Sequence, residues 1–337
     1  MFTKFVKGKT YIIAEIGGNF TTYAEAAKLV DLAKKAGVDA VKLQTFKAST
    51  LVTKDAIFDM ENTGIVSQYE IFQKFEINEN LHKQVFDYVR ESGLDWFSTP
   101  SHEEDVDLLE SLNVGAHKVG SDDAINIPLL KKLARTKKPI LLSTGMCTLE
   151  EVKESVGAIL EEGNDKIFLL HAITSYPTHP ENVNLQVLDT FKKEFPNLVI
   201  GYSDHTLGIT ASLCAVAMGA EVIEKHFTYD KKADGPDHML SADYVEMKEI
   251  VDRVREFEIM RGTGIKRPAD SEEKTRRNNR KSLVVLKDIQ EGEVFTSINL
   301  GVRRPGYGIK PKFFEQIIGK RAAKSLKSDA VLQWGDV

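Results

Sequence analysis

Cysteine is scarce in this chain. Cys147 and Cys214 are the only two in 337 residues, which excludes a disulfide framework and favours a reducing, cytoplasmic setting. No run of 18 apolar residues occurs, and the N-terminal segment lacks the apolar core of a signal peptide, so we expect no membrane span. The net charge is −5 and the only basic stripe is 274–281, so we expect no nucleic acid partner.

Motifs for nucleotide cofactors and serine nucleophiles are also missing. Gly17 and Gly18 follow an apolar run, but neither Gly-x-Gly-x-x-Gly after a strand nor Gly-x-x-x-x-Gly-Lys-Ser/Thr is present. The sequence also has no nucleophile-elbow motif in which a serine could be activated by histidine and aspartate. Nucleotide-dependent chemistry and serine-nucleophile chemistry are therefore not expected.

The chain does contain eight repeats of an apolar, strand-like run followed by an amphipathic helix. A strand that is buried on both faces has a short continuous apolar run. Eight such strand–helix units predict a closed (β/α)₈ TIM barrel, with its active site at the carboxyl ends of the strands. The expected strands are 11–16, 40–45, 94–99, 116–121, 140–145, 167–171, 199–205 and 222–227, and the expected helices are 23–36, 81–92, 103–112, 127–135, 149–162, 207–218 and 242–260.

The composition changes after the last of these helices. We expect a barrel over 1–260, a polar, turn-rich linker over 261–280 and a small β-rich domain over 281–337, with strands at 282–286, 299–303 and 330–333. The last domain is small for an independent core, so it should dock on its own barrel or on another subunit. The stretch 48–77 is too long for an ordinary connection and predicts a lid packed down by Tyr69, Phe72 and Phe75.

Polar residues cluster where the expected strands end. In a barrel they would gather at one mouth: Glu15, Lys42, Gln44, Thr99, Lys118, Ser121, Ser143, His171, His205, Glu224 and His226.

His205 and His226 end neighbouring strands and could share one divalent ion, leaving positions for water and substrate. Asp237, on the loop after the eighth strand, adds a further ligand-type side chain. A lone histidine in a strand is more often a hydrogen-bonded core residue, so a structural role stays open for each of the two.

Lys42 and Lys118 lie inside apolar strands, where a lysine is costly unless it is paired or faces a ligand. Two lysines at one mouth would repel each other unless an anion lay between them. The hydroxyl groups of neighbouring strand ends favour a pocket for one phosphorylated small anion. The alternative is a purely structural pairing of a lysine with Glu15 or Glu224.

Taken in order, the strand-end motifs resemble the sialic acid synthase family, which includes legionaminic and pseudaminic acid synthases. The segments 279–283 and 302–308, with Ile318-Gly-Lys, resemble that family's C-terminal antifreeze-like (SAF, β-clip) domain. The barrel motifs are Ala14-Glu-Ile-Gly17, Val41-Lys-Leu-Gln-Thr45, Ser98-Thr-Pro100, Lys118-Val-Gly-Ser121, Leu142-Ser-Thr-Gly-Met146, Leu170-His171, Tyr176-Pro-Thr178, Gly201-Tyr-Ser-Asp-His-Thr206, Ile223-Glu-Lys-His-Phe227 and Gly235-Pro-Asp237.

The resemblance implies an enzyme, a transferase that condenses phosphoenolpyruvate with an open-chain N-acetylated aldose and releases phosphate. It implies that Lys42, Thr99, Lys118, Ser121, Ser143 and Ser203 bind phosphoenolpyruvate. His205 and His226 would bind Mn²⁺ or Mg²⁺, Glu15 would be the catalytic carboxylate, and Gln44, Tyr176 and Asp237 would contact the sugar. Arg304 would reach a neighbour's site in a domain-swapped homodimer.

Three positions depart from the family pattern. Phe20 replaces a histidine, Ala172 replaces a cysteine, and Thr174 stands where asparagine or serine is frequent. We expect Phe20 at the mouth, where an apolar ring favours a less hydroxylated acceptor, such as a diacetamido-dideoxy sugar on the way to legionaminic or pseudaminic acid.

Two other functions stay open. A phosphoenolpyruvate-dependent 3-deoxy-ulosonate phosphate synthase or a barrel aldolase would act on a phosphorylated sugar and need a second cationic pocket, yet strand-end basic residues are few. A non-catalytic carbohydrate- or ice-binding protein would have lost the mouth residues, and the core set is intact.

Overall fold

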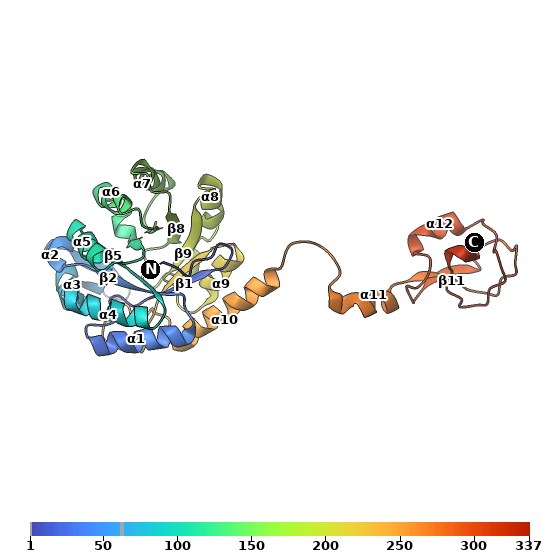
Figure 1. Ribbon diagram of the computed structural model, residues 1–337, viewed down its shortest axis with the longest axis horizontal. Helices are drawn as coiled ribbons and strands as arrows, with labels where there is room; N and C mark the ends of the chain where they lie inside the picture. Colours follow the sequence, from blue (N-terminus) through green and yellow to red (C-terminus); the bar gives the residue numbers. More distant parts are fainter. Residues whose placement is uncertain (1, 61–63) are drawn as a thin grey trace. The chain divides into compact units, whose positions relative to one another are not determined.

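The computed structural model describes residues 2–60 and 64–337, which form two compact units, 1–262 and 263–337. The first unit is the predicted TIM barrel, in which eight parallel strands close into a ring (Figure 1). The ring order is β1, β10, β9, β8, β7, β6, β5, β2. The strands are β1 (Tyr11–Glu15), β2 (Ala40–Thr45), β5 (Asp95–Pro100), β6 (His117–Val119), β7 (Ile140–Ser143), β8 (Ile167–Ala172), β9 (Val199–Asp204) and β10 (Val222–His226).

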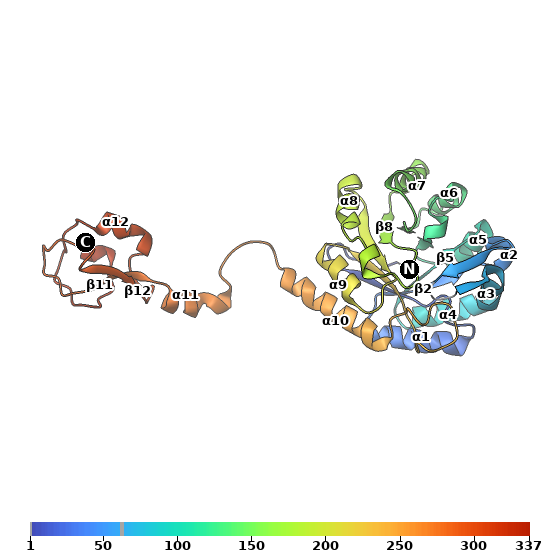
Figure 2. The same ribbon diagram turned by 180° about the vertical axis from the view of Figure 1, so that it is seen from behind.

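Helices surround the ring of strands, as both views show (Figures 1 and 2). Three of them begin with capping boxes, in which Thr22, Thr148 and Asp243 each exchange hydrogen bonds with the glutamate three residues later. The helices are α1 (Tyr23–Ala36), α4 (Glu79–Glu91), α5 (Glu103–Ser111), α6 (Ile127–Arg135), α7 (Leu149–Glu161), α8 (Val187–Glu194), α9 (Thr210–Ala217) and α10 (Tyr244–Arg261).

Helix α8 is absent from the sequence-based expectation. It has only eight residues and follows a stretch with two prolines, Pro177 and Pro180. Its signal was the pair Leu188 and Phe191, which are three apart and both buried against the barrel.

Side chains alternate along each strand between the inside of the barrel and the helix layer. The lower inside is an apolar floor made of Tyr11, Ile13, Ala40, Phe97, Ala116, Leu141, Phe168, Leu170 and Val222. A separate, larger cluster contains the alternate strand residues, such as Ile12 and Val41, together with the helix faces. The next inward position above the floor on each strand is therefore at the carboxyl end, where the site lies.

The N-terminal segment closes the floor from below. The rings of Phe2 and Phe5 lie 5.2 and 4.8 Å from that of Phe168. The buried Asp95 carboxylate accepts hydrogen bonds at 2.9 Å from Thr3 N, Thr3 Oγ1, Lys4 N and the Tyr11 hydroxyl. These contacts close the barrel at the end opposite the site.

The expected lid region, 48–77, contains α2 (Ala48–Leu51), a hairpin of β3 (Ile57–Met60) with β4 (Gly64–Ser67), and α3 (Gln68–Phe75), while residues 61–63 of this range lie outside the described residues. Phe72 packs against Phe46 and Phe58, with ring centroids 5.2 and 5.5 Å apart. Lys74 of α3 pairs with Asp234 on the loop after β10 at 2.7 Å. The insertion is therefore tied to the loops at the carboxyl ends of the strands.

The second unit has its own core, built from Leu283, Val285, Ile289, Phe295, Leu300, Ile309, Ile317, Ala322 and Leu332. It contains α11 (Glu273–Asn279), the antiparallel pair β11 (Ser282–Val285) and β12 (Leu300–Arg303), and α12 (Phe314–Ile317). The expected strand at 330–333 is wrong, because this segment makes only a single bridge, from Val331 to Val284. In the described parts of both units, no helix combines the length and apolarity that a membrane crossing requires.

The four hydrogen bonds to Asp95 generate a stability prediction. We expect Asp95→Ala to lower the free energy of unfolding by about 3 kcal/mol, because it leaves the buried Tyr11 hydroxyl unsatisfied and removes the three bonds that hold the N-terminal segment. Urea unfolding followed by circular dichroism measures this change. Asp107→Ala is the control, since that exposed carboxylate pairs with Lys132 and with no other described residue. Equal, small losses in both variants would contradict the prediction.

Candidate active site

The strand register brings the predicted site residues together at the mouth. Glu15 lies opposite Lys42 on one side and His226 on the other, and Glu224 lies opposite Ser203. Inward positions at or next to the carboxyl ends of the strands hold Glu15, Lys42, Gln44, Thr99, Lys118, Ser143, Ser203, His205, Glu224 and His226.

The two lysines lie on either side of a carboxylate. Lys42 pairs with Glu15, and its Nζ lies 3.7 Å from Glu224 Oε2, while Lys118 Nζ lies 3.6 Å from Glu224 Oε1. All four side chains are at most 5% exposed. The sequence predicts an anion between the two lysines, and in the structure that anion is the carboxylate of Glu224. The alternative prediction, that Lys42 pairs with glutamates, also holds.

Burial and mutual attraction set the charges of this cluster. Burial lowers the pKa of Lys118 to about 8, although Glu224 opposes the shift, so its ammonium group is mostly protonated at neutral pH. Burial also disfavours the charged form of Lys42, but Glu15 and Glu224 outweigh it and raise its pKa. Burial raises the pKa of Glu15, whereas the two lysines hold the pKa of Glu224 below its ordinary value. Glu224 is thus the firmly ionised carboxylate, and Glu15 is the one that protonates more easily.

Hydroxyl groups surround the lysines. Thr99 Oγ1 accepts a hydrogen bond from Lys42 Nζ at 2.9 Å, and Ser203 Oγ donates to Glu224 at 3.0 Å. Ser121 lies in the loop after β6, where its Oγ accepts from Gly145 N at 2.9 Å. Among the described residues, Ser143 Oγ is buried without a hydrogen-bond partner. A buried hydroxyl without a partner is a group that a ligand can satisfy.

The two histidines are neutral and partly free. Their ring centroids lie 5.5 Å apart. Burial lowers the pKa of His205 to about 4, and burial together with His205 holds the pKa of His226 well below its ordinary value. His205 Nδ1 hydrogen-bonds Ile173 O at 2.7 Å, which fixes that nitrogen as the donor and leaves Nε2 with a lone pair. His226 Nδ1 is buried without a hydrogen-bond partner in the described chain.

This donor set fits a divalent cation that takes further ligands from substrate or water. Neutral imidazoles are good metal ligands, and a catalytic site keeps open positions. Within residues 2–60 and 64–337, no group of three or more His, Cys, Asp or Glu side chains is arranged to hold a metal ion. The chain itself would therefore supply few ligands.

Two loops add polar groups beside the histidines. The Tyr176 hydroxyl lies 3.4 Å from His205 Nε2, and Asp237 Oδ2 lies 3.5 Å from His226 Nδ1. Burial and the nearby Glu15 raise the pKa of Asp237 to about 7. A Cβ at Gly17 would lie 2.6 Å from both Gln44 Cγ and Glu15 Oε1, so only glycine lets the first loop pass this close.

The loop that carries Asp237 is held by a residue that the sequence analysis did not assign to the site. Asn19 Nδ2 donates to Phe227 O at 3.0 Å and to Ser241 Oγ at 2.9 Å, and Ser241 Oγ donates to Asp237 O at 2.6 Å. Asn19 and Ser241 are fully buried. No rule based on sequence spacing predicts a contact between positions so far apart in the chain. The only signal was the expected fold, because β1 and β10 are neighbours in any closed barrel of eight consecutive strands.

Two expectations for the mouth are wrong. His171 points outward, because its neighbours Leu170 and Ala172 hold the inward positions of β8, and its Nε2 bonds Val183 O at 2.8 Å. Phe20 is 3% exposed and packs in the cluster between strands and helices, so it is no apolar wall for a substrate. Thr174, by contrast, has a buried Oγ1 with no hydrogen-bond partner in the described residues, next to Gly145.

Arg304 belongs to the second unit. Its side chain is exposed, and it makes no hydrogen bond or ion pair with the described residues. Its neighbour Arg303, by contrast, pairs with Asp329.

Comparison with known proteins identifies the chain. Residues 29–266 match the model of the NeuB family, and residues 280–337 match that of the SAF domain. The chain therefore belongs to the NeuB family of sialic acid-type synthases, and it is an enzyme, as its strand-end motifs predicted.

Relatives match almost the whole chain. It is 40% identical to an N,N'-diacetyllegionaminic acid synthase of Campylobacter jejuni, over 96% of this chain and 99% of the relative. It is 35% identical to a pseudaminic acid synthase of the same species, over 97% and 96%. The N-acetylneuraminic acid (sialic acid) synthetase structure from Leptospira borgpetersenii matches with a TM-score of 0.72 and 28% identity, over 79% of this chain and 90% of the other.

A more distant barrel bears on the alternative function. A truncated 3-deoxy-D-arabino-heptulosonate 7-phosphate synthase from Thermotoga maritima matches with a TM-score of 0.61 and 20% identity, over 77% of this chain and 90% of the other. Likeness at this identity shows the shared fold alone, so it does not favour a phosphorylated sugar.

The position of Glu224 between two lysines generates the next prediction. Glu224→Gln should lower the free energy of unfolding by about 3 kcal/mol, because it leaves buried positive charge uncompensated. Added inorganic phosphate should raise the melting temperature of this variant more than that of the wild type, since phosphate would replace the lost charge. Thermal unfolding with phosphate, against chloride at equal ionic strength, measures both effects.

Glu110→Gln is the matched control for Glu224→Gln. Glu110 also bridges two basic side chains, His117 and Lys138, but on α5, outside the barrel. If phosphate stabilised wild type, control and Glu224→Gln equally, Glu224 would not compete with anions for the lysines.

Proposed function

We propose that this enzyme condenses phosphoenolpyruvate with an open-chain N-acetylated aldose, forming a nonulosonic acid and releasing phosphate. The observation that carries the proposal is the pair of buried lysines around Glu224, set among hydroxyl groups and next to two neutral histidines. Phosphoenolpyruvate has two anionic groups, and buried ammonium groups with hydroxyl donors suit them.

When phosphoenolpyruvate binds, its anionic groups replace glutamate carboxylates as partners of the two lysines. Lys42 and Lys118, with Thr99, Ser121, Ser143 and Ser203, hold its phosphate and carboxylate groups. Two observations support this. Among the described residues, Lys118 forms an ion pair only with Glu224, at 3.6 Å, and Ser143 Oγ has no hydrogen-bond partner. A ligand anion at this position completes interactions that the protein leaves weak.

His205 and His226 hold a divalent cation, Mn²⁺ or Mg²⁺. When bound, this ion supplies Lewis-acid polarisation of the sugar's aldehyde oxygen. The fit rests on two neutral imidazoles: His226 Nδ1 has no hydrogen-bond partner among the described residues, and the lone pair of His205 Nε2 meets only a long contact of 3.4 Å with the Tyr176 hydroxyl there.

Carboxyl groups with raised pKa values handle the protons. Burial raises the pKa of both Glu15 and Asp237, that of Asp237 to about 7, so each carboxyl group takes up a proton more readily than an ordinary carboxylate. Glu15, next to Lys42 and opposite His226, is placed to pass a proton to or from the reacting centre. Asp237, Tyr176 and Gln44 bind the sugar and orient its aldehyde.

The acceptor is a 2,4-diacetamido sugar of the kind that yields legionaminic acid. The support comes from identity, since relatives named diacetyllegionaminic acid synthase reach 40% and those named pseudaminic acid synthase reach 35%. Phe20 does not contribute to this choice of acceptor, because its ring lies in the core. Thr174 offers a free hydroxyl for an acceptor substituent.

A phosphorylated acceptor is disfavoured by charge. At the inward positions of the eight strands, all of them described, Lys42 and Lys118 are the only lysines or arginines. Both are required for phosphoenolpyruvate, so no second cationic pocket remains on the strands.

The test is a phosphate-release assay with phosphoenolpyruvate, Mn²⁺ and a panel of sugars. We expect turnover with a diacetamido sugar of the legionaminic series, less with N-acetylmannosamine, and none with phosphorylated aldoses. EDTA should abolish turnover, and Mn²⁺ or Mg²⁺ should restore it. Full activity after prolonged dialysis against EDTA would remove the metal from the mechanism, and a preference for a phosphorylated aldose would overturn the proposed reaction.

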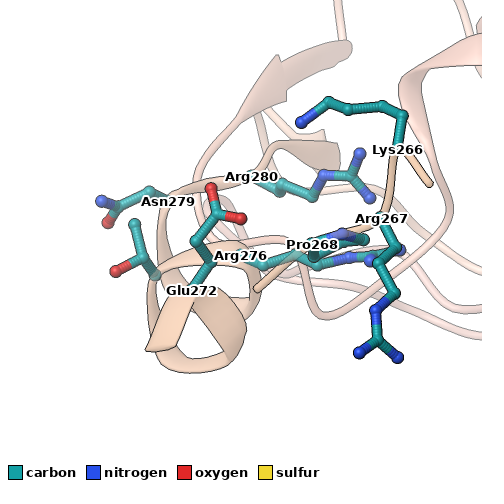
Figure 3. A pocket seen from close by; sticks show the side chains of 8 residues that line it. Lys266, Arg267, Pro268, Glu272, Arg276, Asn279 and Arg280 are labelled. Carbon is teal, nitrogen blue, oxygen red and sulfur yellow. The ribbon is translucent and has the colours of Figure 1, made fainter. Parts of the chain in front are cut away.

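We also propose that two chains share their sites through the second unit. The unit 263–337 has 16 Lys and Arg against 9 Asp and Glu, a net charge of +7, while 1–262 has 29 against 41, a net charge of −12. A basic groove of about 520 Å³ in the second unit is lined by Lys266, Arg267, Arg276 and Arg280, with Glu272 as its one acidic side chain (Figure 3). Opposite charge favours docking of this unit on a barrel, and exchange between two chains is a low-cost route to a dimer.

Mixing two inactive variants tests the shared site. Arg304→Ala and Lys118→Ala chains, each nearly inactive alone, should regain activity when co-expressed and purified as heterodimers. In a shared arrangement one mixed site carries both defects and the other carries neither. Heterodimers with no more activity than the separate variants would show that Arg304 acts within its own chain or not at all.

A further inference from the structure

A buried ion pair lies on the outer face of β9 and β10, and the proposed mechanism does not use it. Asp204 Oδ2 and Lys225 Nζ are 2.9 Å apart, and their side chains are 0% and 2% exposed. The two residues lie opposite each other in the register of the strands. Each directly precedes one of the two proposed metal ligands, His205 and His226.

The pair holds the backbone of Thr206, the residue directly after His205, through both its N–H and its carbonyl group. Asp204 Oδ1 accepts from Thr206 N at 2.9 Å, and Lys225 Nζ donates to Thr206 O at 2.6 Å. Ser212 of α9 donates to Asp204 Oδ2 at 2.6 Å. The peptide units next to His205 are thus tied both to β10 and to the first turns of α9.

Stability alone is a weak reason for such a pair. The other outward residues of these strands, such as Tyr202, Ile223 and Phe227, form an apolar core. A buried ion pair is often no more stabilising than packed apolar side chains of the same volume, but it fixes geometry because each partner demands a defined position. Side chains alternate along a strand, so the inward neighbours of Asp204 and Lys225 are His205 and His226. Fixing the outward pair therefore also fixes the distance between the two histidines.

We propose that Asp204 and Lys225 are positioning residues, which set the separation and orientation of His205 and His226 for cation binding. This inference rests on the proposed function, in that the two histidines bind the metal ion. His205 Nδ1 is already oriented by Ile173 O, and the ion pair adds the second constraint, on the backbone. Groups behind metal ligands commonly tune affinity in this way.

Lys225→Met is the discriminating variant. Removing a positive charge near a cation site would by simple electrostatics tighten cation binding, whereas loss of positioning would weaken it. We expect the Kd of the metal-free full-length protein for Mn²⁺, measured by calorimetry without substrates, to rise at least tenfold. Lys225→Arg, which keeps the charge and the donor, should recover most of the affinity.

Two control variants separate the possible failures. Asp39→Asn breaks another ion pair, with Arg255 at 2.8 Å, away from the mouth, and should destabilise the barrel while leaving Mn²⁺ affinity unchanged. His205→Ala should abolish Mn²⁺ binding. If it does not, the proposed metal site fails, and with it the premise of this inference.

If His205→Ala loses Mn²⁺ but folded Lys225→Met binds it with wild-type or higher affinity, the positioning role is overturned. Should Lys225→Met fail to fold, Lys225→Gln takes its place, because it removes the same charge but keeps a donor. The same direction of change is expected there, and tighter binding would again overturn the proposal.

Discussion

The burial of four charged side chains inside a closed barrel is the constraint on which the mouth depends. Lys42, Lys118, Glu15 and Glu224 are almost completely removed from solvent, and each would be prohibitive alone. They are tolerated because the barrel brings opposite charges from adjacent or nearby strands to the same level. The positive and negative charges at the mouth must therefore nearly cancel, and a charged ligand can bind only if the charges already there change to match it.

The rest of the barrel leaves the charged cluster open at one end only, as far as the described residues show. The apolar floor and the N-terminal segment close the lower opening, so water and ligands have access only from the carboxyl ends of the strands. A low-dielectric floor also strengthens every interaction between charges above it. An anion that enters between the lysines gains from that environment, and its added negative charge requires a carboxylate of the mouth either to move or to take up a proton. The raised pKa of Glu15 makes protonation the easier course.

Much of this arrangement could be predicted from sequence, because short apolar runs separated by amphipathic helices have few other solutions. The errors have physical reasons. His171 ends a strand like the true mouth residues, and only the period of two along β8, with Leu170 and Ala172 inward, shows that it faces the helices. Phe20 follows the first strand in a loop, where no periodicity exists to say which way a ring turns. The role of Asn19 depends on partners from distant segments, Phe227 and Ser241, which one sequence without its fold does not bring together.

Two buried ion systems meet on opposite faces of β10, and the completeness of their hydrogen bonding distinguishes them. Asp204 has both oxygens bonded, to Lys225, Ser212 and Thr206, at distances of 2.6–2.9 Å, so nothing remains for a ligand to satisfy. Glu224 is held by Ser203, but its Oε2 has no hydrogen-bond partner in the described chain, and its lysines stand 3.6 and 3.7 Å away. A saturated pair resists rearrangement, whereas a loosely bonded one can exchange partners at low cost. The outward pair therefore suits a fixed support and the inward cluster suits a binding site, although both are equally buried.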